Sequence, residues 1–248
     1  MASTIPAGFP TESTTGVPAG TKLTAYTGPM TITQDGTVID GKIISGTLII
    51  EAANVVIQNC GVSNVGFWGI DASAATNTTV KNCTIVGPGY EHNADSAIVG
   101  SGTFSGNNIS AFENGIRLQD GSSLVTGNYI HDLAAAGADP HYDGIAVQGG
   151  QNGVLIENNT VIGRDTSDVF IKNDFGPINN VTVNHNYLIG DPVYAIYVDG
   201  RASGGPVTNV TISNNLVQKG GYGYYSVDNS NPVITGNIEF LPGQTPPN

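Results

Sequence analysis

Residues 167–190 read Ser-Asp-Val-Phe-Ile-Lys-Asn-Asp-Phe-Gly-Pro-Ile-Asn-Asn-Val-Thr-Val-Asn-His-Asn-Tyr-Leu-Ile-Gly. The tetrad Val183-Asn184-His185-Asn186 is one copy of a pattern that recurs along the chain, an apolar residue followed by a polar turn that ends in asparagine. Residues 169–172 alternate as in a short strand with one buried face, which places Lys172 on the outer face. The stretch therefore predicts a repeating β unit and an outward lysine.

The repeat extends over most of the chain. Eight copies end at Cys60, Cys83, Asn107, Asn128, Asn159, Asn186, Asn215 and Asn237, with intervals from 21 residues (107 to 128) to 31 residues (128 to 159). Such periods indicate a solenoid. Stacked coils bring equivalent side chains about 4.8 Å apart. The asparagines are then expected to hydrogen-bond from coil to coil as an internal ladder.

Two cysteines, Cys60 and Cys83, occupy this position in the first two copies, so we expect them to be stacked neighbours. A disulfide and two buried free thiols are both compatible with that placement. Two ligands are too few for a metal site.

The composition supports an all-β fold. The 248 residues include 34 glycines and only 11% charged residues, so straight-chain helix formers are scarce. We expect one domain over residues 1–248, in which residues 1–30 lead into a cap over the first coil, residues 31–240 form the coils and residues 241–248 form a tail.

The charge excludes several classes of partner. A net charge of -12 with only 8 basic residues argues against nucleic acid and anionic membranes. No apolar run reaches the ~20 residues of a transmembrane helix. The start, Met1-Ala2-Ser3-Thr4, lacks the regions of a signal peptide. Any export leader is therefore expected to lie outside this sequence.

The repeats resemble those of the right-handed parallel β-helix shared by polysaccharide lyases, pectinases, epimerases and phage tailspikes. The resemblance rests on stretches such as Asn180-Val181-Thr182-Val183 and Val154-Leu155-Ile156-Glu157-Asn158-Asn159, and it covers residues 31–240. It implies the fold strongly and the activity weakly, because this architecture hosts several chemistries.

Side chains on the outer face of one sheet are the candidates for function. The strands that precede the asparagine copies align as residues 115–119, 144–148, 168–172, 195–199 and 224–228. Alternation predicts two outward columns. The first column contains Arg117, Ala146, Phe170, Tyr197 and Ser226. The second column contains Gln119, Gln148, Lys172, Asp199 and Asp228.

The longest intervals between copies contain the loops at residues 137–144 and 199–205. Insertions in a solenoid commonly fall on its binding face. Arg164 precedes the Lys172 strand and Arg201 follows the Tyr197 strand, so we expect these three cations to form one positive patch.

This patch suits β-elimination on a uronic-acid polysaccharide. The reaction needs neutralisation of the sugar carboxylate, a base for the C5 proton and an acid for the leaving oxygen. Lys172, Tyr142 or Tyr197 can act as the base, and a tyrosine can protonate the leaving group. His141 can serve in either role. The expected substrate-binding residues are Arg117, Gln119, Gln148, Arg164, Phe170, Asp199 and Arg201.

Residues 170–178, together with His141-Tyr142-Asp143-Gly144, resemble metal-independent β-helix alginate lyases. The resemblance implies Lys172 and either Tyr142 or Tyr197 at the chemistry, on alginate or a similar uronan. We therefore expect a secreted or extracellular monomer that binds an acidic polysaccharide and needs no cofactor. Aspartates near the site suit calcium in principle, but without a spaced calcium-loop pattern we favour a role in orienting Lys172 and His141.

Three alternatives remain at this point. Asp139-Pro140-His141 also occurs in β-helix alginate C5-epimerases, although Ala136-Gly137-Ala138 stands where those enzymes carry Tyr-Gly-Phe. A glycoside hydrolase would use a carboxylate pair such as Asp143/Asp168 or Asp168/Asp174. A solenoid that binds carbohydrate without cleaving it, or is purely structural, fits the acidic composition.

Overall fold

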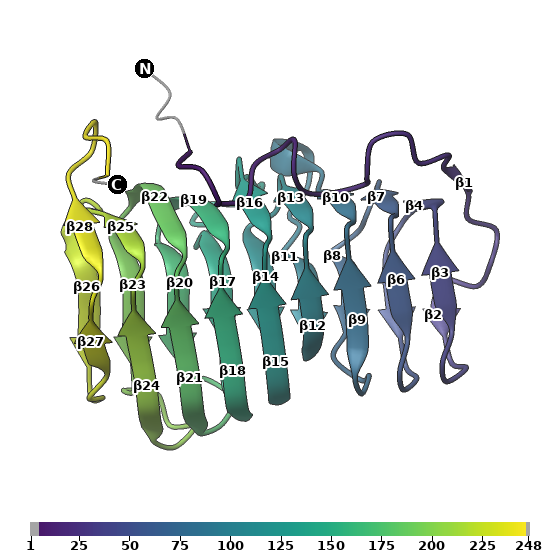
Figure 1. Ribbon diagram of the computed structural model, residues 1–248. Helices are drawn as coiled ribbons and strands as arrows, with labels where there is room; N and C mark the ends of the chain where they lie inside the picture. The colour runs from purple at the N-terminus through teal and green to yellow at the C-terminus, as the bar shows by residue number, and fades with distance from the viewer. Residues whose placement is uncertain (1–4, 247–248) are drawn as a thin grey trace.

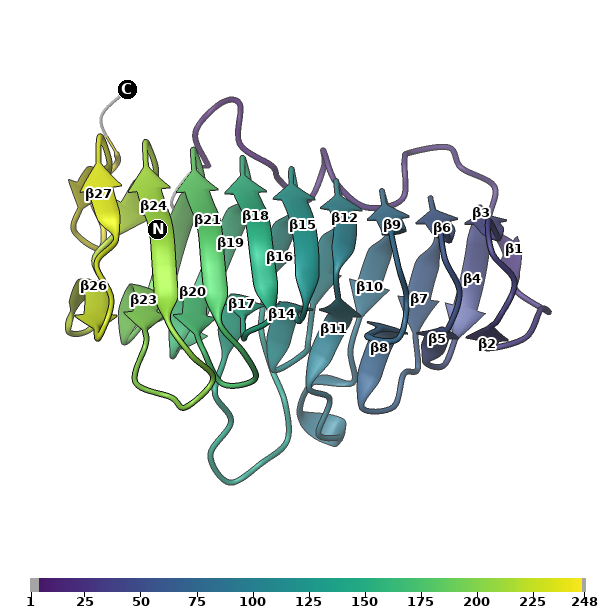
Figure 2. The ribbon, with the colours of Figure 1, turned by 90° about the horizontal axis from the view of Figure 1, so that it is seen from below.

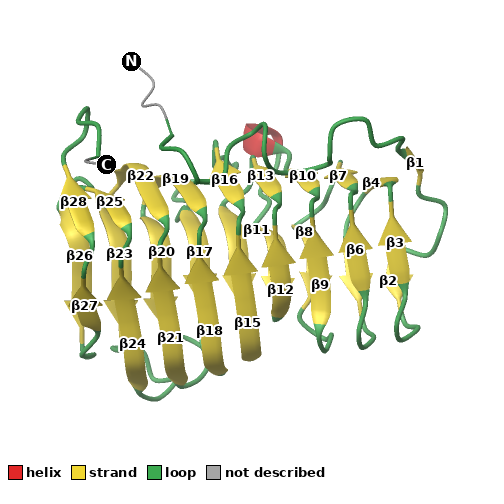
Figure 3. Ribbon diagram, viewed as in Figure 1, coloured by secondary structure: helices red, strands yellow, loops and turns green. Residues whose placement is uncertain are grey.

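The structure, a computed structural model, describes residues 5–246. Its strands stack into an elongated solenoid with three parallel sheets, here named A, B and C (Figure 1). Each coil contributes a strand to sheet C, then to sheet A, then to sheet B. The described helical structure is one 3-10 turn, η1 (Gly89–Glu91), as Figure 3 shows. The predicted all-β, right-handed parallel β-helix is confirmed.

Sheet A contains β1 (Thr24–Ala25), β4 (Lys42–Ser45), β7 (Gly61–Ser63), β10 (Thr84–Val86), β13 (Asn108–Ser110), β16 (Tyr129–His131), β19 (Thr160–Asp165), β22 (Tyr187–Pro192), β25 (Leu216–Gln218) and β28 (Ile238–Phe240). Sheet B contains β2 (Thr31–Ile32), β5 (Leu48–Ile50), β8 (Trp68–Ala72), β11 (Ser96–Gly100), β14 (Asn114–Leu118), β17 (Asp143–Val147), β20 (Ser167–Lys172), β23 (Tyr194–Asp199) and β26 (Gly223–Asp228). Sheet C contains β3 (Val38–Asp40), β6 (Val56–Gln58), β9 (Thr78–Lys81), β12 (Gly102–Ser105), β15 (Gly121–Thr126), β18 (Gln151–Glu157), β21 (Ile178–Asn184), β24 (Val207–Ser213) and β27 (Val233–Thr235).

The bend from sheet C to sheet A explains the sequence repeat. The residue before each ladder position has a positive φ, from 51° at Asn158 to 68° at Gly127. Asparagine and glycine tolerate this left-handed conformation, which is why they alternate at that position. His185 adopts the same conformation with a φ of 52°.

The ladder position itself carries asparagines whose amides are fully used. The Asn128 Nδ2 donates to Asn159 Oδ1 at 2.9 Å and to the carbonyl of Phe104 at 2.9 Å. The backbone N–H of Asn128 also donates to Asn159 Oδ1, at 3.0 Å. The same bonds connect Asn107, Asn128, Asn159, Asn186, Asn215 and Asn237 in register. The predicted ladder is confirmed.

The two cysteines continue the ladder position toward the N-terminus. Both are buried free thiols. Cys83 donates its backbone N–H to Asn107 Oδ1 at 2.9 Å, and its Sγ donates to the Lys81 carbonyl at 3.3 Å. The Sγ of Cys60 donates to the Gln58 carbonyl at 3.0 Å. The thiols therefore replace the asparagine amides as small buried donors.

The N-terminal segment follows a path that its proline and glycine content did not predict. β1 adds an edge strand beside β4, whereas residues before it run outside the coils past β7, β10, β13 and β16 (Figure 1). Phe9 stacks on the His185 ring at a centroid distance of 5.0 Å. The Gly16 N–H donates to the Gly106 carbonyl at 2.8 Å. This segment therefore spans several coils instead of covering only the first.

The interior is one continuous cluster of buried side chains that reaches from Ile32 to Val217. The strands are parallel throughout, so each inward side chain stacks on its equivalents in neighbouring coils. This regular stacking determines which residues of sheet B face outward.

Candidate active site on the outer face of sheet B

The register of sheet B confirms the predicted outward columns. Arg117 pairs with Ala146, Ala146 with Phe170, Phe170 with Tyr197, and Tyr197 with Ser226. Lys172 pairs with Asp199, which pairs with Asp228. The first column also continues to Val99 and Asp71 at its N-terminal end. Sequence alignment missed these two positions because their strands precede the aligned set.

Lys172 ends β20 and is half-buried on this face. Its Nζ lies 2.9 Å from Asp174 Oδ1 and 5.9 Å from the centroid of the Phe170 ring. Asn173, directly after it, is buried and turned toward the 200–205 loop, where its Nδ2 donates to the Ala202 carbonyl at 2.9 Å. The strand end that carries the lysine is therefore held by the neighbouring coil.

Tyr197 lies on the adjacent strand β23, diagonal to Lys172. Its ring is tilted against Phe170 at a centroid distance of 5.5 Å and meets Tyr194 edge-on at 5.3 Å. Burial, reinforced by Tyr194 and the charge of Asp143, raises the pKa of the Tyr197 phenol to about 12. The phenol therefore keeps its proton over the neutral and mildly alkaline range.

Asp143, which the sequence suggested as half of a carboxylate pair with Asp168, is buried. Ser167 Oγ donates to its Oδ1 at 2.6 Å. Burial raises the pKa of Asp143 to about 7, against the lowering effect of that hydrogen bond. Glu113, Lys172 and Asp174 also act on it electrostatically, more weakly than burial does.

Strict alternation fails where β17 begins, at Asp143. Ile145 points inward, and a side chain on Gly144 would also point inward, 2.2 Å from the Val161 Cγ1 atom. Two consecutive inward positions, 144 and 145, place Asp143 on the outer face of the sheet. The sequence contains a hint, since a glycine follows Asp143 at the start of the strand.

Asp168 occupies the equivalent of Gly144 one coil later, and its side chain points inward. Its Oδ1 accepts the Gly163 N–H at 3.0 Å, and its Oδ2 has no partner. Burial raises the pKa of Asp168 well above the usual range. The pairs Asp143/Asp168 and Asp168/Asp174 considered for a glycoside hydrolase therefore do not face one another across a substrate groove.

Two residues of the long loop before β17 lie away from Lys172. Tyr142 is buried, and its phenol contacts the Ala135 backbone, with Ala135 N–H to Oη at 3.3 Å. His141 is exposed on the loop that projects beyond the coils (Figure 2), where its backbone N–H donates to Glu113 Oε1 at 3.0 Å. β17 runs from Asp143 to Val147, so the loop and Lys172 lie at opposite ends of the sheet B strands. The structure does not bring Tyr142 to the lysine.

One of the three cations expected in the positive patch, Arg164, lies away from Lys172. Arg164, in β19, lies over the Tyr142 ring at 4.6 Å and donates to the Tyr90 hydroxyl at 2.5 Å. It precedes β20, whereas Lys172 ends that strand, and six residues of strand span roughly 17 Å. Arg164 and Lys172 therefore do not converge. The length of β20 keeps the two side chains at opposite ends of the strand.

The remaining cations are each paired with a carboxylate. Arg201 forms a two-pronged contact with Asp199, with Nη2 to Oδ2 at 2.7 Å, and reaches Asp228 at 3.2 Å. Arg117 contacts Asp95 at 2.8 Å. The expected substrate-binding residues Arg201, Asp199 and Arg117 are thus on the face, but the sheet carries a mixed network of charges instead of a positive patch.

Two uncharged residues, Gln119 and Gln148, precede Lys172 in the second outward column. Gln148 follows β17, its backbone N–H donates to the Leu118 carbonyl at 3.1 Å, and its side-chain oxygen has no hydrogen-bond partner. Gln119 follows β14 and is half-buried. Gln148 is therefore a polar group next to the lysine that the protein leaves partly unpaired.

Among residues 5–246, no three His, Cys, Asp or Glu side chains gather in a way that would hold a metal ion. The same described segment has no helix long and apolar enough to cross a membrane.

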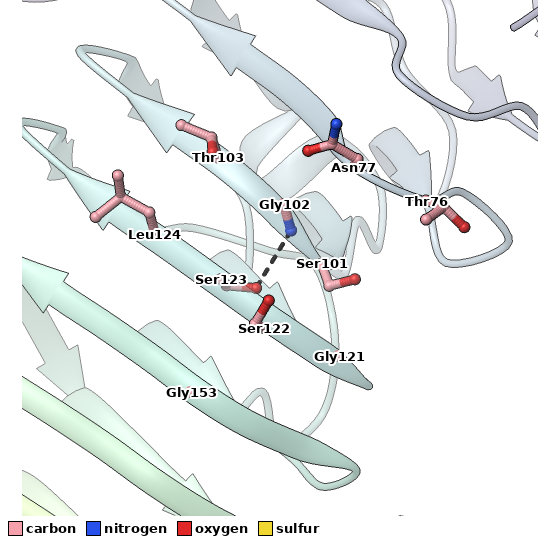
Figure 4. Close-up of a pocket in the computed structure, with 10 residues that line it drawn as sticks. All are labelled: Thr76, Asn77, Ser101, Gly102, Thr103, Gly121, Ser122, Ser123, Leu124 and Gly153. Carbon is pink, nitrogen blue, oxygen red and sulfur yellow. Dashed lines mark hydrogen bonds between the residues drawn. The ribbon is translucent and has the colours of Figure 1, made fainter.

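A separate pocket of about 480 Å³ opens on sheet C, at the beginnings of β9, β12 and β15 (Figure 4). Its lining is uncharged, with hydroxyl groups from Ser101, Ser122 and Ser123. The Gly102 N–H donates to Ser123 Oγ at 3.2 Å there. This pocket holds no acid or base, so the chemistry-bearing side chains remain those of sheet B.

Comparison with known proteins agrees with the coil architecture. An alginate lyase from Paenibacillus sp. str. FPU-7 has a similar structure, with a TM-score of 0.64, 15% identity, and coverage of 87% of this chain and 86% of that chain. The Agl-KA catalytic domain gives a TM-score of 0.59 at 17% identity, and the match covers 84% of this chain and 47% of that domain. No curated protein sequence matches the chain significantly.

These structural likenesses concern the fold, because the sequences have diverged far. The family described as "Right handed beta helix region" matches residues 32–139 and 126–238, which is well over half of the chain. The chain therefore belongs to the right-handed β-helix family.

Proposed function

We propose that the protein is a polysaccharide lyase that cleaves a uronic-acid polysaccharide, such as alginate, by β-elimination on the outer face of sheet B. The observation that carries this proposal is that Lys172 and Tyr197 both lie against the Phe170 ring. They project from adjacent strands beside Phe170, and the tyrosine keeps its proton. The alginate lyase of similar fold supports this choice of substrate class.

In this mechanism the amine of Lys172 takes the C5 proton of the uronate. The electron pair of that C–H bond forms the C4=C5 double bond as the C4–O bond breaks. Tyr197 gives its phenolic proton to the leaving oxygen. The raised pKa of Tyr197 suits it to this acid role and not to that of the base.

Acidification of the C5 proton requires a partner for the sugar carboxylate. Gln148 directly follows Val147, whose partner Ile171 precedes Lys172 on the next coil, and its Nε2 amide group is a hydrogen-bond donor. We assign its amide group to the uronate carboxylate. Arg117 and Arg201 are less suited to this task because Asp95 and Asp199 already hold them.

The acidic surface does not prevent binding of a polyanion. The net charge of -12 repels such a substrate at long range, but salt screens exposed charges beyond about 8 to 10 Å. Local contacts at Lys172 and Gln148 therefore decide recognition once the chain is close. The proposal predicts faster association as ionic strength rises, the opposite of the behaviour of a basic lyase.

The experiment is incubation with a panel of uronans and neutral glycans, followed by ultraviolet absorbance of unsaturated uronate ends. We expect such ends from at least one uronan, with the chelator control unchanged. Tyr197→Phe should lower the rate by about 100-fold, as expected from loss of a general acid. Release of reducing ends from neutral glycans alone, without the absorbance, would contradict the proposal.

A further inference from the structure

We propose that Tyr194 and Tyr222 form an aromatic platform that binds a sugar ring of the polysaccharide, on the C-terminal side of Lys172. The inference deepens the proposed function, on which its choice of a uronan as ligand rests. The proposed subsite binds a sugar ring away from the atoms that react.

A continuous series of aromatic rings leads from the lysine to this platform. Phe170, which lies beside Lys172, contacts Tyr197 at a centroid distance of 5.5 Å. Tyr197 meets Tyr194 at 5.3 Å, and Tyr194 stacks on Tyr222 at 6.1 Å with an interplanar angle of 27°. The series crosses β20, β23 and the turn before β26, so it runs along the solenoid axis, across the strands.

Tyr222 ends the series as an exposed ring on a fixed backbone. It is 76% exposed, the highest value among the large hydrophobic side chains of residues 5–246. Its N–H donates to the Val193 carbonyl at 2.8 Å, and the Gly221 N–H donates to the Pro192 carbonyl at 2.8 Å. A tyrosine held this way offers a large contact area at a low cost in side-chain entropy.

The glycines around Tyr222 make the stacked arrangement possible. A Cβ atom at position 223 would lie 2.9 Å from the Tyr194 Cε1 atom, so only glycine leaves room for that ring. A Cβ atom at position 220 would lie 2.6 Å from the Pro192 carbonyl oxygen. The turn can therefore approach the preceding coil closely enough to lay one tyrosine over the other. The local sequence Gly-Gly-Tyr-Gly is built around this contact.

The opposite half of the same face is unsuited to an acidic chain. Asp71, Asp95 and Glu113 lie toward the N-terminal coils, and the nearby cation Arg117 is committed to Asp95 at 2.8 Å. Like charges at close range repel a uronate. On the aromatic half, Arg201 contacts both Asp199 and Asp228. The ring faces and hydroxyl groups there match the C–H face and the hydroxyl groups of a sugar. We therefore place the bound chain over β23 and β26.

The test is affinity electrophoresis in native gels that contain a soluble uronan or a neutral glycan, with every variant in a Lys172→Ala background so that the gel polymer stays intact. We expect at least one uronan gel to retard the Lys172→Ala protein. Tyr222→Ala should weaken that binding by roughly 3- to 10-fold, the size of one aromatic stacking contact. Tyr222→Trp should keep it, and Tyr90→Ala, which removes a tyrosine that is 65% exposed elsewhere, should not change it.

Equal retardation of the Tyr222→Ala protein and its Lys172→Ala parent would overturn the platform, and so would a lack of retardation by every polysaccharide in the panel. The lyase proposal fails differently. If Tyr222-dependent retardation is present but the wild-type protein forms no unsaturated product, the platform stands as a sugar-binding site and the elimination chemistry does not.

Discussion

The asparagine ladder and the outer face of sheet B are built by the same repeat, yet they use polar side chains in opposite ways. In the ladder, Asn159 accepts from Asn128 at 2.9 Å and donates to Asn186 at 2.9 Å, so its amide is complete. On the outer face, Gln148 has an unpaired oxygen, and Asp143 is buried with a pKa of about 7. Satisfied polar groups stabilise the coils, whereas incompletely satisfied ones remain available for chemistry.

This contrast predicts that substitutions in the two regions affect different quantities. A change in the ladder should lower the free energy of unfolding and leave the rate per folded molecule unchanged. A change on the outer face should lower the rate and change stability little, except where it removes a buried ionisable group.

The largest expected effect is on catalysis. Lys172→Ala should lower the rate of formation of unsaturated ends by about 1,000-fold, within the usual range for loss of a general base. Its urea midpoint should stay close to that of the wild type, because the side chain is 31% exposed. Lys81→Ala, on the outer face of sheet C, is the matched control and should keep full activity. Comparable losses in both variants would show that lysines act through stability alone.

The next effect is a pH dependence of stability that comes from Asp143. Its pKa is raised from 3.8 to about 7 in the folded state, so the folded protein holds a proton that the unfolded chain releases. This contribution is fully present below about pH 4 and is lost as the pH rises through 7. Asp143→Asn should flatten the stability curve over that window, by on the order of 4 kcal/mol. Denaturant unfolding at pH 4, 6 and 8 measures it, and parallel curves for the two proteins would refute the assignment.

A smaller effect is expected from the ladder. Asn159→Ala removes the acceptor of Asn128 and leaves buried donors unpaired, which should lower the free energy of unfolding by about 1–3 kcal/mol. Asn237→Ala, at the exposed end of the ladder, should cost less. Chemical denaturation of both variants provides the comparison. An equal cost at the two positions would mean that burial of the ladder does not set its contribution.

The smallest effect concerns the proposed carboxylate partner. Gln148→Ala should reduce the rate by about tenfold, the value of one hydrogen bond to a charged group. Gln148→Glu should reduce it further, because a carboxylate there repels the uronate. Steady-state kinetics on a uronan separate the two variants. A Gln148→Glu protein as active as Gln148→Ala would remove Gln148 from contact with the carboxylate.

The sequence contained the ladder and the outward columns because both depend on strict stacking. Asn186 and Lys172 occupy positions that recur in every coil, so aligning the copies places them. Departures from the repeat were not predictable in the same way. Tyr142 and Arg164 lie where a long loop returns to the coils, and their contact is non-local. The placement of Asp143 was not predictable from alternation, because two consecutive inward residues break the pattern at the start of β17.

The central claim is that bond cleavage on this face is an elimination. Mass spectrometry of the products formed from a uronan in water enriched in heavy oxygen tests it most directly. The account predicts oligosaccharides with an unsaturated end, lighter by one water than hydrolysis products and without heavy oxygen introduced by bond cleavage. Saturated products that carry one heavy oxygen for each bond cleaved would contradict it.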